Sequence, residues 1–192
     1  VFPNSNTSWH YDDKIGQKYL LEAIKAPIVP SFVFYSKSEA FDFINQSSFP
    51  LVFKLRIGAG SSNVQLIKNR RFAKKLISKA FGNGFRSNIV KIQIKNRFWE
   101  FKRDRNIYAL FKFIKSVTKL FLPFFDKHNF LQEKGYIYFQ NYLPKNNFDT
   151  RLIIIGDRCF ALRRYNREKD FRASGSGFFE YNKELFDLNM IN

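Results

Sequence analysis

Apolar residues in the first part of the chain alternate between helical and strand-like spacing. Residues 14–25 (KIGQKYLLEAIK) repeat their apolar side chains at the spacing of one helix face, which predicts a helix. Residues 28–34 are rich in β-branched and aromatic residues but contain Pro30, a pattern typical of a short edge strand. Ser36 and Glu39 then form a capping-box pattern, so a second helix is expected to begin there.

The next segment has the pattern of two strands joined by a loop and followed by a helix. Residues 51–56 (LVFKLR) and 64–67 (VQLI) are predicted strands. Between them, 57–63 (IGAGSSN) has the composition of a loop. Apolar residues return to helical spacing over 70–81, and Gly82 is expected to end that helix.

Three further strands are predicted near the end of the chain, over 136–143, 151–155 and 159–165. Gly156 and Asp157 separate the last two of these strands. A glycine and an aspartate between two apolar runs are typical of a tight hairpin turn, so we expect these two strands to pair.

The segment 86–130 differs in character, because basic and aromatic residues are interleaved along it. The basic residues are Lys91, Lys95, Arg97, Lys102, Arg103 and Arg105, and the aromatic residues among them are Phe98, Trp99 and Phe101. An amphipathic helix is predicted over 107–122, and we interpret the whole segment as an insertion. We expect this helix to pack its Phe and Leu side chains into the protein. The alternatives are binding of single-stranded nucleic acid or an acidic membrane through 91–122, or packing on a neighbouring domain.

Composition indicates a folded core and an anionic partner. The 192 residues are 45% hydrophobic and include 25 Phe, whereas disordered chains are poor in aromatic residues. The net charge of +17 favours nucleotides, nucleic acid or an acidic membrane face, although an AT-rich genome produces the same bias toward Lys, Asn, Ile and Phe. A single cysteine, Cys159, excludes an intrachain disulfide and suits a cytoplasmic location. Lysines interrupt the longest apolar zone, 107–125, so no transmembrane helix is expected.

One loop has the residues that a phosphate group requires. Lys54 lies on a predicted strand and supplies positive charge from a rigid position. The glycines of the following loop allow sharp turns that bring backbone N–H groups close to an anion, and the serines add donors. These loop residues are Gly58, Gly60, Ser61 and Ser62. An ordinary hairpin loop has the same composition, so both interpretations stay open on these residues alone.

Four segments, taken in order, make the phosphate interpretation more specific. They are DDKIGQKYLLEAIKAPIVP (12–30), PLVFKLRIGAGSSNVQLI (50–67), YIYFQNYLP (136–144) and DTRLIIIGDRCFALRRYNREKDFRASGSG (149–177). In this order the chain resembles the ATP-grasp superfamily, particularly its RimK-like and D-alanine–D-alanine-ligase-like members. The resemblance implies an α+β fold in which two α+β subdomains with antiparallel sheets enclose a nucleotide. The expected division is an N-terminal subdomain over 12–85, the insertion over 86–130 and a partial C-terminal subdomain over 131–192.

The resemblance also implies a role for each matched residue. Lys14 would reach the nucleotide and Lys54 would pair with its α- and β-phosphates, beneath the loop that contains Gly58, Gly60, Ser61 and Ser62. The hinge that reads the adenine edge would be formed by Gln140, Asn141, Tyr142 and Leu143. Asp149 would contact the ribose or the substrate. Three arginines, Arg151, Arg164 and Arg172, match those that face the phosphates or the acyl phosphate, and Arg164 and Arg172 are the candidate catalytic residues.

Members of the family use ATP and Mg²⁺ to phosphorylate a carboxylate, and an amine or thiol then attacks the acyl phosphate. The resemblance therefore implies ATP and Mg²⁺ as cofactors and a small-molecule or peptide carboxylate as substrate. This sequence departs from the family at Leu55, Asn141 and Ser174, where relatives often have proline, an acidic residue and asparagine. The family's late aspartate and Glu-x-Asn metal ligands would lie beyond Gly177, and 178–192 contains no such motif, so no metal ligand is assigned.

Two explanations suit an incomplete match: a fragment of a longer ligase, or a degenerate domain. We expect a fragment, inactive by itself. Two other functions remain as alternatives. One is a basic module that binds nucleic acid or a membrane through residues 91–122, and the other is a non-catalytic domain that binds ATP without turnover.

Overall fold

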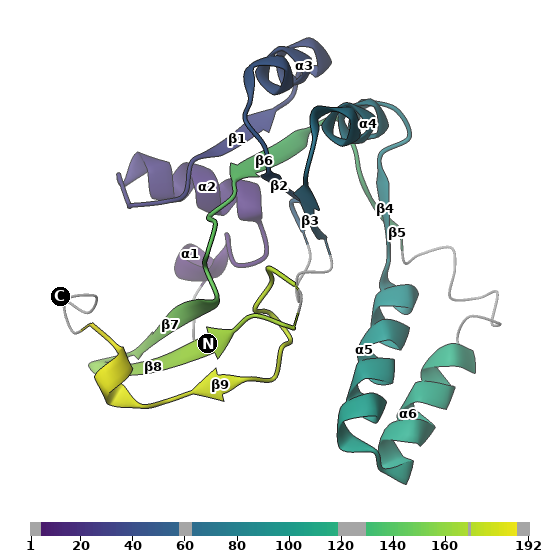
Figure 1. Cartoon of the computed structure of the whole chain (residues 1–192), viewed down its shortest axis with the longest axis vertical. Helices are drawn as coiled ribbons and strands as arrows, with labels where there is room; N and C mark the ends of the chain where they lie inside the picture. Colours follow the sequence, from purple (N-terminus) through teal and green to yellow (C-terminus); the bar gives the residue numbers. More distant parts are fainter. Residues whose placement is uncertain (1–4, 58–62, 119–129, 169, 188–192) are drawn as a thin grey trace.

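The computed structural model describes residues 5–57, 63–118, 130–168 and 170–187, and it combines helices with three antiparallel sheets (Figure 1). The first sheet has four strands in the order β1-β6-β2-β3. These strands are β1 (Ser31–Phe34), β2 (Leu51–Lys54), β3 (Val64–Ile67) and β6 (Ile137–Asn141). All three pairs in this sheet are antiparallel, so the predicted α+β class with antiparallel sheets is confirmed.

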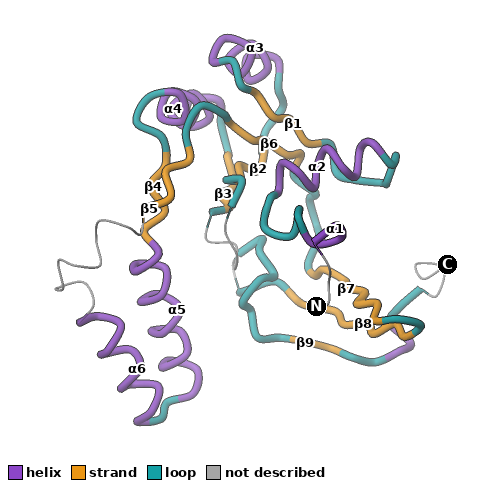
Figure 2. The backbone as a smooth tube through the Cα atoms, turned by 180° about the vertical axis from the view of Figure 1, so that it is seen from behind, coloured by secondary structure: helices purple, strands orange, loops and turns teal. Residues whose placement is uncertain are grey.

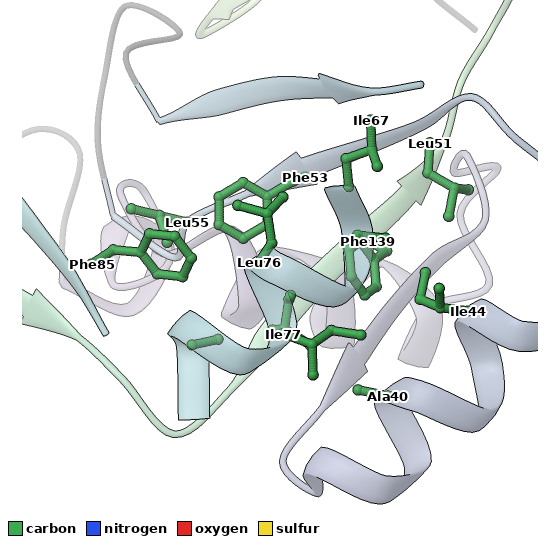
Figure 3. Packing of buried hydrophobic residues seen from close by; sticks show 13 residues of the cluster. Ala40, Ile44, Leu51, Phe53, Leu55, Ile67, Leu76, Ile77, Phe85 and Phe139 are labelled. Atoms are coloured by element: carbon green, nitrogen blue, oxygen red, sulfur yellow. The ribbon is translucent and has the colours of Figure 1, made fainter. Parts of the chain in front are cut away.

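The main hydrophobic core lies between the first sheet and two helices, α3 (Lys37–Gln46) and α4 (Arg70–Phe81). Because successive side chains of a strand point to opposite faces, only every second residue of the central strands enters this core. Phe53 of β2 and Phe139 of β6 are both almost fully buried there, against Ile77 of α4 (Figure 3). The core is therefore built from the odd-numbered residues of β2 and β6.

Helix α2 (Lys14–Ala23) packs on the opposite face of the first sheet, and the short helix α1 (Ser5–Ser8) lies nearby (Figure 1). Asp13 caps α2, because its carboxylate accepts hydrogen bonds from the backbone N–H groups of Ile15 (3.0 Å) and Gly16 (2.9 Å). Ile15 packs against Tyr136 and Tyr138 in a second, smaller cluster. This face is only partly covered by helix, which leaves part of it open to form a site.

A two-stranded ribbon leads away from the first sheet into a pair of helices (Figure 1). The ribbon consists of β4 (Phe85–Asn88) and β5 (Phe130–Glu133), paired antiparallel from Phe85 opposite Glu133 to Asn88 opposite Phe130. The helices are α5 (Ile89–Asp104) and α6 (Ile107–Thr118). They pack on each other and stand apart from the first and third sheets in both views (Figures 1 and 2).

The third sheet consists of β7 (Phe148–Ile155), β8 (Arg158–Tyr165) and β9 (Phe179–Glu180), followed by a 3₁₀ turn, η3 (Lys183–Leu185). A two-residue turn, Gly156-Asp157, joins β7 to β8. Gly156 adopts φ 61°, a left-handed conformation that tight hairpin turns require and glycine tolerates. The predicted hairpin is therefore confirmed.

Other predicted elements are confirmed with small changes at their ends. The predicted helices over 14–25 and 70–81 correspond to α2 and α4, and the predicted strand over 64–67 is β3. Ser36 caps α3 by accepting from the backbone N–H of Glu39 (3.5 Å). The strand expected over 28–34 begins at Ser31, one residue after Pro30, and it lies at the edge of its sheet.

The segment 86–130 differs most from expectation. The sequence pattern did not predict α5, because its apolar residues do not form one continuous stripe and its partner is another helix of the same segment. The helix predicted over 107–122 is described as α6, Ile107–Thr118, and 119–122 lies outside the described residues. The expectation that it packs its Phe and Leu side chains into the protein is wrong for Leu110 and Phe111, which are exposed.

We predict that Phe139→Ala destabilises the protein by about 3–5 kcal/mol, because it removes a fully buried ring from the centre of the core and leaves a cavity. Urea denaturation followed by circular dichroism measures the change. Phe178→Ala is the matched control, because Phe178 is exposed and its loss should cost less than about 0.5 kcal/mol. Equal losses in the two variants would contradict the position of the core.

Candidate functional site

The face of the first sheet opposite the main core presents polar side chains from its two central strands. Lys54 and Gln140 occupy even-numbered positions of β2 and β6, so they point away from the core that contains Phe53 and Phe139. The antiparallel register places Val52 opposite Gln140. The amide of Gln140 donates to the hydroxyl of Ser31 (2.9 Å), which orients it along the sheet.

A cavity of about 240 Å³ lies between this face and the third sheet. Both views show the third sheet across from the first, linked to it by the segment after β6 (Figures 1 and 2). The residues that line the cavity come from both sheets and from two connecting segments. They include eight of the predicted site residues: Lys54, Gln140, Asn141, Tyr142, Leu143, Asp149, Arg164 and Arg172. The chain therefore brings together in one cavity predicted site residues that are up to 118 positions apart in sequence, from Lys54 to Arg172.

The beginning of α2 is fixed to the end of β2, which positions Lys14 close to Lys54. The carboxylate of Asp13 accepts from the Arg56 guanidinium (2.5 Å and 2.8 Å), and the backbone N–H of Lys14 donates to the Arg56 carbonyl (3.0 Å). Burial, followed by the positive charge of Lys14, lowers the pKa of Lys54 to about 8. Burial also lowers the pKa of Lys14, although Asp12, Glu133 and Asp13 oppose that shift. The site thus holds two cations near each other in a partly dehydrated place.

Arg164 forms a two-point ion pair with Asp149 across the β7–β8 hairpin. The two residues are direct partners in the strand register. The guanidinium of Arg164 donates to the two carboxylate oxygens of Asp149 at 2.5 Å and 3.2 Å. The Arg164 side chain is only 12% exposed, so this pair is held in place more firmly than a surface ion pair.

Arg172 is also paired with a carboxylate. Its guanidinium donates to Asp170 at 2.6 Å to 3.0 Å. Next to it, Arg167 donates through Nε to the carbonyl of Ser174 (2.8 Å) and closes the loop 167–174. Burial, together with the nearby charge of Arg172, lowers the pKa of Arg167. This loop therefore carries two arginines whose positive charges lie near each other.

Three groups of predicted site residues are not among the described residues that line the cavity. Lys14 is close to Lys54 but does not line the cavity. Arg151 is exposed on β7 and does not line the cavity. Gly58, Gly60, Ser61 and Ser62 lie outside the described residues. The roles inferred for all the site residues stay predictions.

A network of buried polar groups holds the two ends of the segment 57–63, and the sequence did not indicate it. The hydroxyl of Tyr136 donates to Glu133 (2.6 Å) and accepts from the backbone N–H of Arg56 (2.7 Å). Glu133 also accepts from the backbone N–H of Ile57 (3.1 Å). At the other end, the amide of Asn63 donates to the Ile57 carbonyl (2.8 Å). Burial and the Glu133 carboxylate raise the pKa of Tyr136, so its hydroxyl stays protonated. The bonds to the backbone of Arg56 and Ile57 join residues 80 and 76 positions apart, so no local motif links them.

Two searches of the described residues bear on metals and membranes. Within the described ranges, no group of three or more His, Cys, Asp or Glu side chains is placed to hold a metal ion. Among the helices of those same ranges, none has the length and apolar character needed to cross a membrane.

Comparisons with known proteins give structural likenesses but no match in sequence. No family model matches the chain, and no curated protein matches it in sequence. Among solved structures, a phosphoribosylamine–glycine ligase from Thermotoga maritima is similar over 81% of this chain, with 14% identity and a TM-score of 0.47. The chain spans 29% of the length of that ligase. A likeness this slight carries no weight for function.

We predict that Lys54→Met stabilises the protein near neutral pH by up to about 3 kcal/mol, because it removes a dehydrated cation. The folded-state pKa of about 8 lies below the ordinary lysine value of 10.5. Between these values the unfolded wild-type chain holds a proton that the folded chain has lost, so wild-type stability rises with pH. The advantage of the variant should therefore be largest below pH 8 and shrink toward pH 10.5. Urea midpoints at both ends of this window measure it, and an advantage independent of pH would contradict the dehydrated cation.

We also predict that Tyr136→Phe destabilises the protein by about 1–3 kcal/mol, because Glu133 and the N–H of Arg56 each lose a buried partner. Thermal and urea denaturation measure the loss. Tyr181→Phe provides the control, since Tyr181 is exposed and the change should have almost no effect.

Proposed function

We propose that this chain is the nucleotide-binding part of an ATP-dependent carboxylate–amine or carboxylate–thiol ligase of the ATP-grasp type. The observation that supports this most is the cavity itself. It collects the hinge residues, the strand lysine and the two candidate catalytic arginines from separate segments, although nothing in their local sequence requires them to meet. The finer likeness to RimK-like and D-alanine–D-alanine-ligase-like members remains part of the proposal.

The hinge between the two sheets is the proposed adenine end of the site. Residues 140–143 end β6 and begin the connection to the third sheet, and all four line the cavity. A strand that leaves its sheet presents backbone N–H and C=O groups that can hydrogen-bond to the edge of a base. Apolar groups of Val29, Val52 and Leu143 on the walls of the cavity would contact the faces of that base.

The lysine pair is the proposed phosphate end. Two neighbouring ammonium groups repel each other and lose hydration, and the lowered pKa of Lys54 reflects that cost. A polyphosphate would offset the cost by supplying negative charge, and it would raise the pKa of Lys54 again. Gly58 to Ser62 would close over these phosphates, as the family resemblance implies.

The arginines are proposed to act at the transferring group. In the proposed reaction, an oxygen of the substrate carboxylate forms a bond to the γ-phosphorus while the bond to the ADP oxygen breaks. An amine or thiol then forms a bond to the acyl carbon, and phosphate leaves. Arg164 and Arg172 would neutralise the charge on these oxygens. Both are held by carboxylates in the structure, so substrate phosphates would have to compete with Asp149 and Asp170 or be bound beside them.

Mg²⁺ accompanies ATP in such reactions, but the described residues do not fit a resident metal site. Asp149 is the carboxylate that lines the cavity within the described ranges, and it is engaged by Arg164. No step is therefore assigned to a protein-bound metal. When bound, the ion would neutralise phosphate charge.

Calorimetric titration with ATP and Mg²⁺ tests the proposal. We expect saturable binding that prefers ATP to GTP and is weakened at least about tenfold by Lys54→Met, because the variant loses the charge at the phosphate end. Affinity should also decrease as the pH rises through about 8, where Lys54 loses its proton.

Lys74→Met is the matched control, because it removes the same charge from an exposed position on α4. If ATP and GTP bind equally, or if the two lysine variants bind ATP alike, binding reflects only the net charge of +17 and the proposed site is wrong. Binding that passes these controls without any turnover would instead favour the non-catalytic nucleotide-binding alternative.

A further inference from the structure

The helix pair α5–α6 has a small core of its own. Phe113 of α6 lies against Phe98 and Phe101 of α5, with ring centroids 5.5 Å and 6.5 Å apart. Ala109 and Ser116 of α6 are buried on the same side. The side of α6 that faces α5 is therefore packed within the helix pair. The remaining apolar residues of α6 need a separate explanation.

Those remaining residues form one continuous stripe on the outer side of α6. The outer stripe consists of Ile107, Leu110, Phe111 and Ile114, which follow the spacing of a single helix face. All four are exposed, and the largest exposed fractions are 86% for Ile107, 62% for Phe111 and 51% for Ile114. Scattered exposed apolar residues are ordinary, but a contiguous apolar face on a projecting helix indicates a binding surface.

Basic side chains accompany the outer stripe. Helical spacing places Lys112 and Lys115 along one edge of it, beside Tyr108, and the Lys112 ammonium lies 4.1 Å from the centre of the Tyr108 ring. Residues 97–118 include six basic residues and only two acidic residues. An apolar stripe with lysines and an aromatic residue at its edge is the pattern of a helix that lies in the plane of a membrane surface.

We propose that the outer stripe of α6 docks on the surface of an anionic lipid bilayer, with the helix lying flat at the boundary between headgroups and acyl chains. The aliphatic side chains and Phe111 would enter the acyl region, and Lys112 and Lys115 would contact anionic headgroups. The helix pair projects from the rest of the chain, so α6 can reach a flat surface without obstruction by the first or the third sheet (Figures 1 and 2). This proposal does not depend on nucleotide binding.

The chemistry of the stripe argues against two other occupants. Single-stranded nucleic acid is held by aromatic rings that stack on bases, whereas three of the four stripe residues are aliphatic and cannot stack. A second copy of this chain would bring the same lysines together, in addition to a net charge of +17 on each molecule. Anionic lipid is the partner that suits both the aliphatic stripe and its positive edge.

Co-sedimentation of the full 192-residue chain with vesicles tests the proposal. We expect binding to vesicles of phosphatidylcholine with phosphatidylserine, much weaker binding to phosphatidylcholine alone, and weakening as salt rises. Phe111→Ser/Ile114→Ser should lower the partition coefficient at least about tenfold, because both side chains would lose their place in the acyl region. Lys112→Gln/Lys115→Gln should lower it about tenfold on the anionic vesicles only.

Two variants separate this surface from general charge and general hydrophobicity. Lys74→Gln/Lys75→Gln removes the same charge from exposed positions of α4, and Ile154→Ser removes an exposed aliphatic side chain from β7. Both should bind vesicles like the wild-type chain. Circular dichroism of every variant checks that the helices are retained, as expected for substitutions at exposed positions.

Three results would overturn the proposal. The first is a lack of binding to anionic vesicles, and the second is binding that the stripe variants and the controls reduce equally. The third is self-association or oligonucleotide binding that Phe111→Ser/Ile114→Ser abolishes while vesicle binding persists, which would assign the stripe to another partner. Light scattering and fluorescence anisotropy with a labelled oligonucleotide measure these alternatives.

Discussion

The antiparallel pairing of β2 with β6 is the constraint on which both the core and the cavity depend. Alternate residues of a strand point to opposite faces, so a single register sends Phe53 and Phe139 into the core and Lys54 and Gln140 into the cavity. A shift of one residue in either strand would exchange the two sets. The large free-energy gain from burying two phenylalanines therefore also fixes the position of the lysine.

Electrostatic interactions in and beside the cavity are arranged in two different ways. At the end near β2, Lys14 and Lys54 are close together, and burial disfavours their charges. At the end near the third sheet, Arg164 is held by a carboxylate through two hydrogen bonds. The first arrangement costs free energy and attracts an anion, whereas the second fixes the orientation of its arginine.

The helix pair α5–α6 depends on different interactions from the rest of the molecule. Its inner surface is stabilised by Phe113 against the aromatic residues of α5, and a narrow two-stranded ribbon connects it to the first sheet. Its outer stripe contributes nothing to that packing, and exposed apolar area of this kind costs free energy in water. The proposed contact with an anionic bilayer would account for the stripe, whereas the packing of the helix pair does not.

Local patterns in the sequence determined most elements of the two larger sheets and of the helices around the first. Helical spacing predicted α2 and α4, a cap predicted the beginning of α3, and a glycine turn predicted the β7–β8 hairpin, because each depends on residues within one turn or one strand of each other. The family resemblance also selected residues that the cavity collects, such as Lys54 and Arg164.

Tertiary structure alone decided the rest, because the deciding contacts join distant segments. The sequence did not indicate the Glu133–Tyr136 network, whose partners near Arg56 are more than seventy positions away. Nor did it indicate that Asp149 already holds the candidate catalytic Arg164, since the strand register creates that pair. For α6, the sequence determined an amphipathic helix but not which of its faces is packed against the protein. The packing of α5 against α6 decided which face is buried, and it left the outer stripe exposed. The pattern of α5 is itself too irregular to predict.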